Sequence, residues 1–255
     1  MRGKRVAVIT GASSGIGEAT ARELASRGWH CILLARRAEK LAPLAQAIGG
    51  EFEVCDVSDR AGVERVAAAV TGRHQRIGLL VNNAGIAGRG SFLDVEPELI
   101  EQVMDTNYLG GVWCLSAFLP ALEAAGGAHV VNVVSVAGTV SFAPAGPYTA
   151  SKHAQLAFSR SAAALLRGRG ISVHTVLPGF VETEGFPQQS TLRSRLMRRF
   201  VIEAPQVATA IANAVEHDKR EITVPWFPYR LLSIGQALLP ALYARVVGRL
   251  GYRPL

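Results

Sequence analysis

The sequence contains few cysteines, only three in 255 residues, and they are far apart: Cys31, Cys55 and Cys114. Each lies in an apolar segment. The pattern therefore predicts buried, reduced thiols and argues against a disulfide framework or a cysteine-based zinc site. We expect no metal ligand set.

Two other patterns are also missing. Residues 1–9 show no charged region followed by a long apolar run, so we expect no secretory signal and a cytoplasmic protein. No lysine and arginine run alternates with aromatic residues, although the net charge is +7. The charge therefore favours an anionic cofactor, an acidic carrier or a membrane surface as partner, and we expect no nucleic acid.

What is present is an alternation of short β-branched runs with alanine- and leucine-rich helical stretches. A chain with 49% hydrophobic residues fits one large core, which we assign to residues 1–225, followed by an apolar, basic tail at 226–255. The alternation predicts a doubly wound (Rossmann) three-layer α/β/α fold with a seven-stranded parallel sheet. The expected strands are 6–9, 31–34, 51–55, 79–81, 129–134, 172–176 and 221–224.

A glycine turn follows the first of these runs, with Gly11, Gly15 and Gly17 leading into the helical stretch 15–27. Glycines there permit a tight turn and let the amide groups of a helix N-terminus approach a pyrophosphate. The turn therefore predicts a dinucleotide site.

Tyr148 and Lys152 are four residues apart in a second helical stretch, so their side chains share one face. A neighbouring ammonium favours the phenolate and lowers the pKa of the phenol, which makes tyrosine usable as a general acid or base. Together with the glycine turn, the pair points to hydride exchange with a dinucleotide.

From the glycine turn to about Thr183 the chain resembles the classical short-chain dehydrogenase/reductase family. The further matches are Asp56-Val57, Asn82-Asn83-Ala84-Gly85, Asn107, Ser135, and Pro178-Gly179 followed by Val181 and Thr183. The resemblance implies the catalytic set Asn107, Ser135, Tyr148 and Lys152. It also implies a cofactor site made of Gly11, Ser13, Ser14, Gly15, Ile16, Gly17, Arg36, Asp56, Val57, Asn83, Ala84, Gly85, Tyr148, Lys152, Pro178, Gly179, Val181 and Thr183.

The same resemblance implies a role for each catalytic residue. Tyr148 would donate the proton, Ser135 would hold the carbonyl oxygen, Lys152 would also bind the nicotinamide ribose, and Asn107 would bind a water that relays protons. Asp56 would accept a hydrogen bond from the adenine amine. Each residue also has a purely structural alternative, such as a buried tyrosine or a serine cap.

The end of the second expected strand, Ala35-Arg36-Arg37, has no carboxylate to accept a bond from a ribose 2′-hydroxyl. A guanidinium there, with Arg36 as first choice, would bind a 2′-phosphate, so NADP(H) is the expected cofactor. The alternative is two solvated arginines opening the next helix.

The tail lacks the Val-Asp-Gly-Gly-like ending of many soluble family members and has no acidic residue after Glu221. Pro240 interrupts its apolar stretch, so we do not expect a spanning helix. One interpretation is a segment lying in a bilayer interface, loosely similar to membrane-associated members acting on steroids or other lipids. The other is packing on its own domain or on a second subunit. The basic stretch 193–200 matches the position of the family's substrate lid, and a solvated helix is the alternative.

These observations predict an NADP(H)-dependent oxidoreductase that reversibly reduces a ketone or aldehyde on an apolar, lipid- or steroid-like small molecule. Two alternatives stay open: a 3-oxoacyl thioester reductase acting on a carrier-bound substrate, and a non-catalytic NADP-binding regulator. The resemblance further implies a homodimer or homotetramer that pairs through the helical stretches 98–124 and 148–168.

Overall fold

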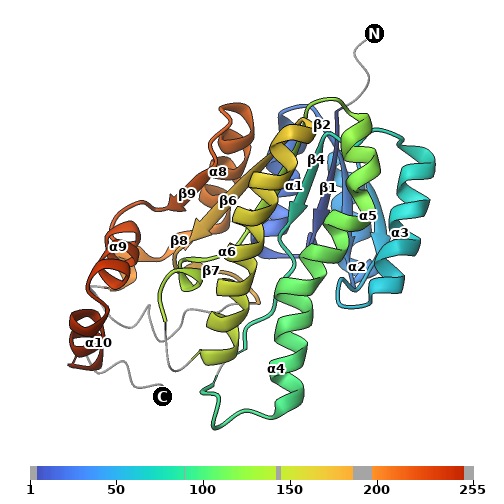
Figure 1. The fold of residues 1–255 in the computed structure, drawn as a ribbon. Coiled ribbons are helices and arrows are strands. Elements are labelled where there is room, and N and C mark those ends of the chain that lie inside the picture. The colour runs from blue at the N-terminus through green and yellow to red at the C-terminus, as the bar shows by residue number, and fades with distance from the viewer. Residues whose placement is uncertain (1–4, 89, 142–144, 186–196, 250–255) are drawn as a thin grey trace.

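The computed structural model describes residues 5–88, 90–141, 145–185 and 197–249. Its centre is a sheet of seven parallel strands in the order β3-β2-β1-β4-β5-β6-β9 (Figure 1). The predicted fold class is confirmed. The strands are β1 (Arg5–Thr10), β2 (Trp29–Ala35), β3 (Glu51–Val54), β4 (Leu79–Asn82), β5 (Ala128–Val133), β6 (Ile171–Pro178) and β9 (Glu221–Val224).

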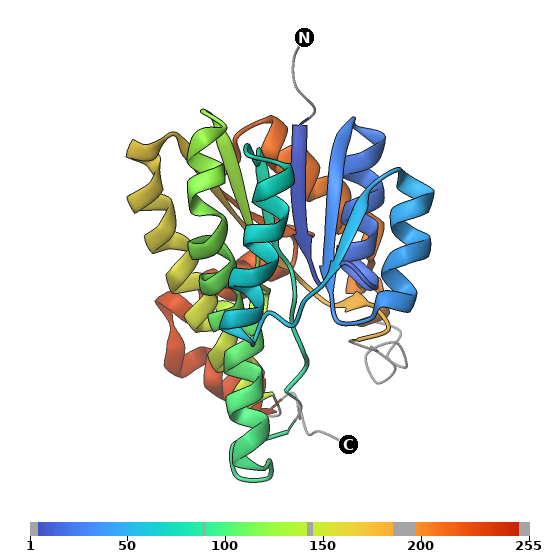
Figure 2. The same ribbon diagram turned by 90° about the vertical axis from the view of Figure 1, so that its right-hand side faces the viewer.

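Helices cover both faces of the sheet; Figure 2 looks onto one of these faces, with helices in front of the strands. One face carries α1 (Gly15–Ser26), α2 (Ala38–Ile48) and α8 (Ala204–Glu216), and the other carries α3 (Arg60–Arg73), α5 (Gly110–Ala124) and α6 (Gly146–Leu166). Successive strand residues point to opposite faces of the sheet: Ile9 packs with the first group of helices and Val8 with the second. Strands that are buried on both faces consist of continuous apolar residues, which is why their positions could be predicted from the sequence.

The strand order reverses beside β1. The chain first runs outward through β2 and β3 and then returns to place β4 on the other side of β1. Loops that leave β1 and β4 therefore diverge, and a crevice opens beyond the carboxyl ends of these strands. The predicted glycine turn follows β1 at this point.

The helical stretch expected at 98–124 differs from a single α-helix. It consists of α4 (Pro97–Met104), a π-helical turn η1 (Asp105–Leu109) and then α5. A π turn adds one residue to a helical turn and is often found at functional sites. The apolar residues of α4 and of α5 each keep the helical period, and the one extra residue between them does not interrupt the pattern. The sequence therefore could not show the π turn. Asn107, which is buried, lies in this turn.

Short elements complete the chain. They are η2 (Val136–Gly138), η3 (Arg167–Arg169), η4 (Met197–Phe200), a two-residue parallel pair β7 (Val181–Glu182) and β8 (Ile202–Glu203), and the tail helices α9 (Tyr229–Leu238) and α10 (Pro240–Arg249). Of the stretch expected at 193–200, residues 193–196 lie outside the described residues, and the remainder is the single turn η4.

The first tail helix, α9, packs on the protein near the carboxyl end of β6. Tyr229 is buried, and its hydroxyl donates to the Phe200 carbonyl at 2.8 Å and accepts from the Phe180 amide at 3.2 Å. The Ser233 hydroxyl lies 2.6 Å from that of Thr139, just after η2. A side chain at Gly179 would overlap the Tyr229 ring. The inner face of α9 thus packs on the protein's own domain.

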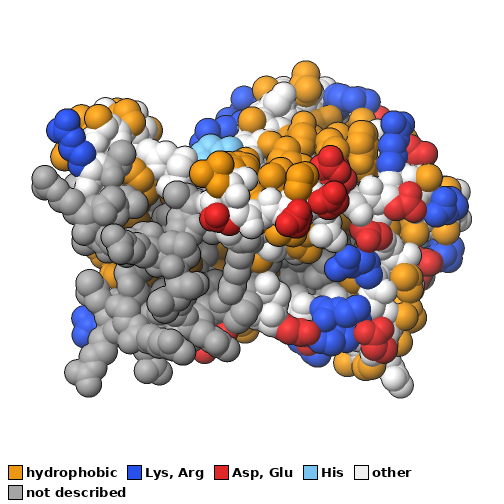
Figure 3. Space-filling view, turned by 90° about the horizontal axis from the view of Figure 1, so that it is seen from below, with side chains coloured by type: hydrophobic (Ala, Val, Ile, Leu, Met, Phe, Trp, Pro, Cys, Tyr) orange, Lys and Arg blue, Asp and Glu red, His pale blue; other side chains and the backbone are white. Residues whose placement is uncertain are grey.

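The outer face of the tail is apolar and exposed. Figure 3 views the molecule from the end where the strands finish, with apolar side chains in orange. Among the tail residues whose burial the structure describes, the large apolar side chains that are exposed are Trp226, Phe227, Leu231, Leu232, Ile234, Leu238, Leu239 and Leu242. In the described part of the chain, no helix combines the length and the apolarity needed to cross a bilayer. Interfacial contact of the tail stays a prediction.

Candidate active site

A cleft of about 530 Å³ opens beyond the carboxyl ends of the strands. Almost all the residues assigned from the sequence line it, although they come from segments far apart in the chain. These are Gly11, Ser13, Ser14, Gly15, Ile16, Arg36, Asp56, Val57, Asn83, Ala84, Gly85, Ser135, Tyr148, Lys152, Pro178, Gly179, Val181 and Thr183. Two others, Gly17 and Asn107, lie behind the lining.

The glycine turn is held against the loop that follows β4. Gly11 and Gly15 adopt φ values of +64° and +57°, which favour glycine. The Thr10 hydroxyl accepts from the amides of Asn83 and Ala84, each at 3.0 Å, and the Asn83 side chain donates to the Thr10 carbonyl at 2.9 Å.

Gly17 leaves room for this packing, because a Cβ there would overlap the Gly11 carbonyl oxygen. The turn therefore presents its backbone and the start of α1 to the cleft, an arrangement that fits a pyrophosphate group.

The adenosine end of the cleft carries Asp56, which follows β3. One carboxylate oxygen accepts from the amide and hydroxyl of Ser58 at 3.0 and 2.7 Å. The other lies 3.7 Å from an Arg36 nitrogen. The fixed carboxylate at a half-exposed position is suited to accept a hydrogen bond from an adenine amine.

Arg37, rather than Arg36, reaches the glycine turn. Its guanidinium donates to the Ser13 hydroxyl at 3.2 and 3.0 Å and to the Ser14 hydroxyl at 2.9 Å. It also pairs with Glu184 at 2.9 Å. The sequence favours Arg36 as the guanidinium at the end of β2; the structure places Arg36 3.7 Å from Asp56, a contact that the order of residues in the chain does not show.

Lys152 is buried on the face of α6 that meets the sheet. Its ammonium donates to the Val133 carbonyl at 3.2 Å and to the Gln155 side chain at 2.7 Å, and lies 5.7 Å from the centre of the Tyr148 ring. Helical spacing thus places the pair together, as the sequence predicted. Burial lowers the pKa of Lys152 to about 7.

Ser135 follows β5 and adjoins Tyr148. Its hydroxyl accepts from the Ala137 amide at 3.1 Å and donates to the Pro178 carbonyl at 3.5 Å. Burial raises the pKa of Tyr148 to about 12, and a hydrogen bond with Ser135 opposes this rise. The sequence argument expected Lys152 to lower the pKa of the phenol. Desolvation instead is the largest influence on both groups, although only Lys152 is fully buried and Tyr148 is partly buried.

Asn107 clamps two segments that border the cleft. Its side chain accepts from the Ile86 amide at 2.7 Å and donates to the Ile86 carbonyl and the Ser151 hydroxyl, each at 3.0 Å. Gly85 allows close approach, because a Cβ there would lie 3.2 Å from the Asn107 oxygen. This side chain therefore fixes the loop after β4 against α6, next to Lys152.

Two residues of the site were missed from the sequence. Gln155, buried on α6, is the side-chain partner of the Lys152 ammonium, and its position three residues after Lys152 was the only available signal. Glu184 reaches Arg37 and Lys40 across the cleft from the segment after β7. No local sequence pattern links residues so far apart.

Replacing Asn107 with Ala should lower the free energy of unfolding by about 2 kcal/mol or more, because the Ile86 amide and carbonyl would lose their buried partner. Urea denaturation measures the change. Asn213→Ala is the control: its side chain bonds Arg27 at a half-exposed position, so the loss should stay below about 1 kcal/mol. Equal, small losses in both variants would contradict the clamp.

Comparisons with known proteins agree with this geometry. The family model described as short chain dehydrogenase matches residues 5–192. An uncharacterized oxidoreductase of Mycobacterium tuberculosis is 45% identical over 181 residues, which are 71% of this chain and 71% of that protein.

Solved structures are similar over most of the chain. A short chain dehydrogenase/reductase from Burkholderia phymatum in complex with NAD has a TM-score of 0.80 at 28% identity, covering 92% of this chain and 94% of that one. A variant of actinorhodin polyketide ketoreductase with NADPH has a TM-score of 0.79 at 28% identity, covering 88% and 97%. The chain therefore belongs to the short-chain dehydrogenase/reductase family and is an oxidoreductase that uses a nicotinamide dinucleotide.

Proposed function

We propose that this protein reversibly reduces a ketone or aldehyde to an alcohol with NADP(H). The observation that carries the proposal is the meeting of Ser135, Tyr148 and Lys152 in the cleft that also holds the glycine turn. The nicotinamide ring, when bound, would supply hydride to the carbonyl carbon or accept it from the alcohol. The residues of the chain would then manage the proton and the developing charge.

Tyr148 would act as the general acid. Because burial raises its pKa to about 12, the phenol keeps its proton at neutral pH and can donate it to the oxygen that gains negative charge. Ser135, hydrogen-bonded to Tyr148, would bind the same oxygen and polarise the carbonyl. The two hydroxyl groups would thus converge on one substrate atom.

Lys152 would stabilise the phenolate that proton donation leaves. A tyrosinate in a buried site is unfavourable without a nearby cation, and the Lys152 ammonium lies 5.7 Å from the centre of the ring. Gln155 and the Val133 carbonyl hold that ammonium in place. The stabilisation is needed only after the proton moves, so it assists the reaction more than the ground state.

Replacing Tyr148 with Phe should reduce turnover of a carbonyl substrate by about 10²- to 10⁴-fold, because the proton donor is removed. Binding of NADPH, measured by fluorescence titration, should be unchanged. Tyr108→Phe is the matched control, since Tyr108 packs edge-on against Phe158. Full residual activity of the Tyr148→Phe variant would refute the assignment of the acid.

The charges beside the glycine turn favour NADP(H). β2 ends at Ala35, without a carboxylate, and Arg37 and Lys40 lie on the adjoining segment. Arg37 already contacts Ser13 and Ser14, so we infer that Arg37, with Arg36 beside it, would bind the 2′-phosphate. Tighter binding of NADH than of NADPH by the wild-type protein would count against this preference.

Glu184 forms ion pairs with two of these basic side chains, Arg37 and Lys40. Its carboxylate lies 2.9 Å from Arg37 and 2.6 Å from Lys40, and these partners, Lys40 first, lower its pKa. A 2′-phosphate would compete with Glu184 for both groups. Glu184 thus opposes binding of the phosphorylated cofactor more than that of NAD(H).

Glu184→Gln should tighten NADPH binding several-fold and change NADH binding less, because it releases Arg37 and Lys40 for the phosphate. Isothermal titration calorimetry with both cofactors measures the difference. Glu64→Gln makes the same charge change on α3, where Glu64 pairs with Arg60, and should affect neither cofactor. Equal tightening of NADPH and NADH in the Glu184→Gln variant would argue against competition at the 2′-phosphate.

For the substrate, we propose an apolar, lipid- or steroid-like carbonyl compound. Phe180 lines the cleft and packs edge-on against Tyr229 at the start of α9, so the apolar tail borders the opening. A carrier-bound 3-oxoacyl thioester is the second candidate, favoured by the similarity to a polyketide ketoreductase. A panel of steroid, retinoid and 3-oxoacyl thioester substrates, followed by the absorbance of NADPH, separates the two.

A further inference from the structure

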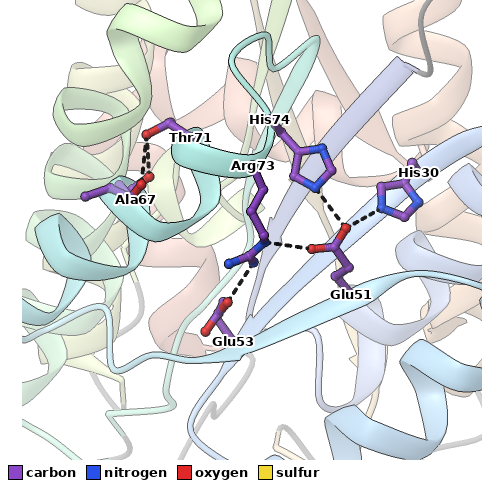
Figure 4. Close-up of polar contacts among 8 residues, drawn as sticks. His30, Glu51, Glu53, Ala67, Thr71, Arg73 and His74 are labelled. Carbon is purple, nitrogen blue, oxygen red and sulfur yellow. Dashed lines mark hydrogen bonds and ion pairs between the residues drawn. The ribbon is translucent and has the colours of Figure 1, made fainter.

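A cluster of two histidines and a carboxylate lies where β2 and β3 begin, at the opposite end of these strands from the cleft. Figure 4 shows its side chains. His30 is near the start of β2, Glu51 begins β3 and His74 directly follows α3. The Nε2 atoms of both imidazoles lie 2.8 Å from the same Glu51 oxygen, Oε1. Three separate elements thus direct their polar atoms to one point, roughly 17 Å along β2 from the catalytic edge.

The charged side chains around this point would favour a bound cation. Arg73 donates to the second Glu51 oxygen at 3.1 Å, which fixes the carboxylate. Glu53 in turn accepts from Arg73 at 2.7 Å and neutralises it. With neutral imidazoles, Glu51, Glu53 and Arg73 together carry one net negative charge. Arg73 can therefore orient the Glu51 carboxylate while the group as a whole still attracts a dication.

The donor set matches zinc. Two imidazole nitrogens and one carboxylate, with a fourth position open to water, form a known zinc environment. The three ligand atoms lie within 4.8 Å of one another. Tetrahedral zinc separates its nitrogen and oxygen ligands by about 3.3 Å, so each contact would widen by about half an ångström. The side chains of His30, Glu51 and His74 are 15, 33 and 20% exposed, which leaves access for ion and water.

Another group of this kind, His129, His174 and Asp218, is less suited to an ion. Both ring nitrogens of His174 are already used, Nε2 with His129 at 2.9 Å and Nδ1 with the Lys219 carbonyl at 2.8 Å. His174 is also fully buried.

We propose that His30, Glu51 and His74 form a zinc site that ties β2, β3 and the end of α3 together. Each Nε2 proton now directed at Glu51 would pass to Nδ1 or to solvent, and the freed lone pairs would bind the ion. Because imidazole must be unprotonated at the ligating atom, binding should weaken in acid. The sequence predicts no metal site because the cysteines do not form a ligand set. His30, Glu51 and His74 are too far apart in the chain to form a recognisable motif.

The test is a Zn²⁺ titration of full-length, chelator-treated protein in competition with a chromophoric chelator. We expect one equivalent to bind and to raise the unfolding midpoint. His74→Gln keeps a donor for Glu51 but removes the ligand nitrogen, so the affinity should fall by more than the 10- to 100-fold typical of losing an outer partner. Glu51→Gln should have a similar effect. Bound Co²⁺ should show the visible bands of a tetrahedral site.

His217→Gln, at the end of α8, and His129→Gln are matched controls and should bind Zn²⁺ as the wild type does. Circular dichroism and NADPH binding verify that each variant folds. Absence of a saturable site, unchanged affinity in both ligand variants, or loss of binding in His129→Gln would overturn the proposal. None of these readouts depends on catalysis, so they are independent of the proposed reductase activity.

Discussion

The arrangement of the site depends on the burial of one amine. Lys152 lies inside the protein, where the Val133 carbonyl and the Gln155 side chain bind its ammonium. Because Val133 ends β5 and Lys152 belongs to α6, the Val133 contact ties the helix to the carboxyl end of that strand, while Gln155, on the same helix, holds the amine in place. The same helix places Tyr148 one turn earlier, so the position of the proton donor follows from the position of the lysine.

Burial also sets the acid-base balance of the site. Desolvation raises the pKa of Tyr148 to about 12 and lowers that of Lys152 to about 7. The two shifts make a charged pair unfavourable before reaction and leave the phenol protonated. Charge would then form where hydride transfer requires it, which is how a buried site favours the transition state over the ground state.

The sequence predicted the features that depend on neighbours in the chain. The strands are continuous apolar runs, the glycine turn is one local segment, and Tyr148 and Lys152 meet through helical spacing. It could not predict the π turn at Asn107, which one inserted residue creates. Nor could it predict the contact of Glu184 with Arg37, or the dominance of burial over charge at Tyr148, since these depend on how distant segments pack. Subunit association and membrane contact stay predictions.

The burial of Lys152 is tested most directly by titrating its amine. The chain has only four lysines, Lys4, Lys40, Lys152 and Lys219, so lysine-labelled protein should give a resolved NMR spectrum in which Lys152→Arg identifies the signal. Burial of this amine predicts a pKa near 7 in the protein without added cofactor. A titration near the ordinary value of 10.5 would show a solvated lysine and contradict the buried amine on which the proposed chemistry depends.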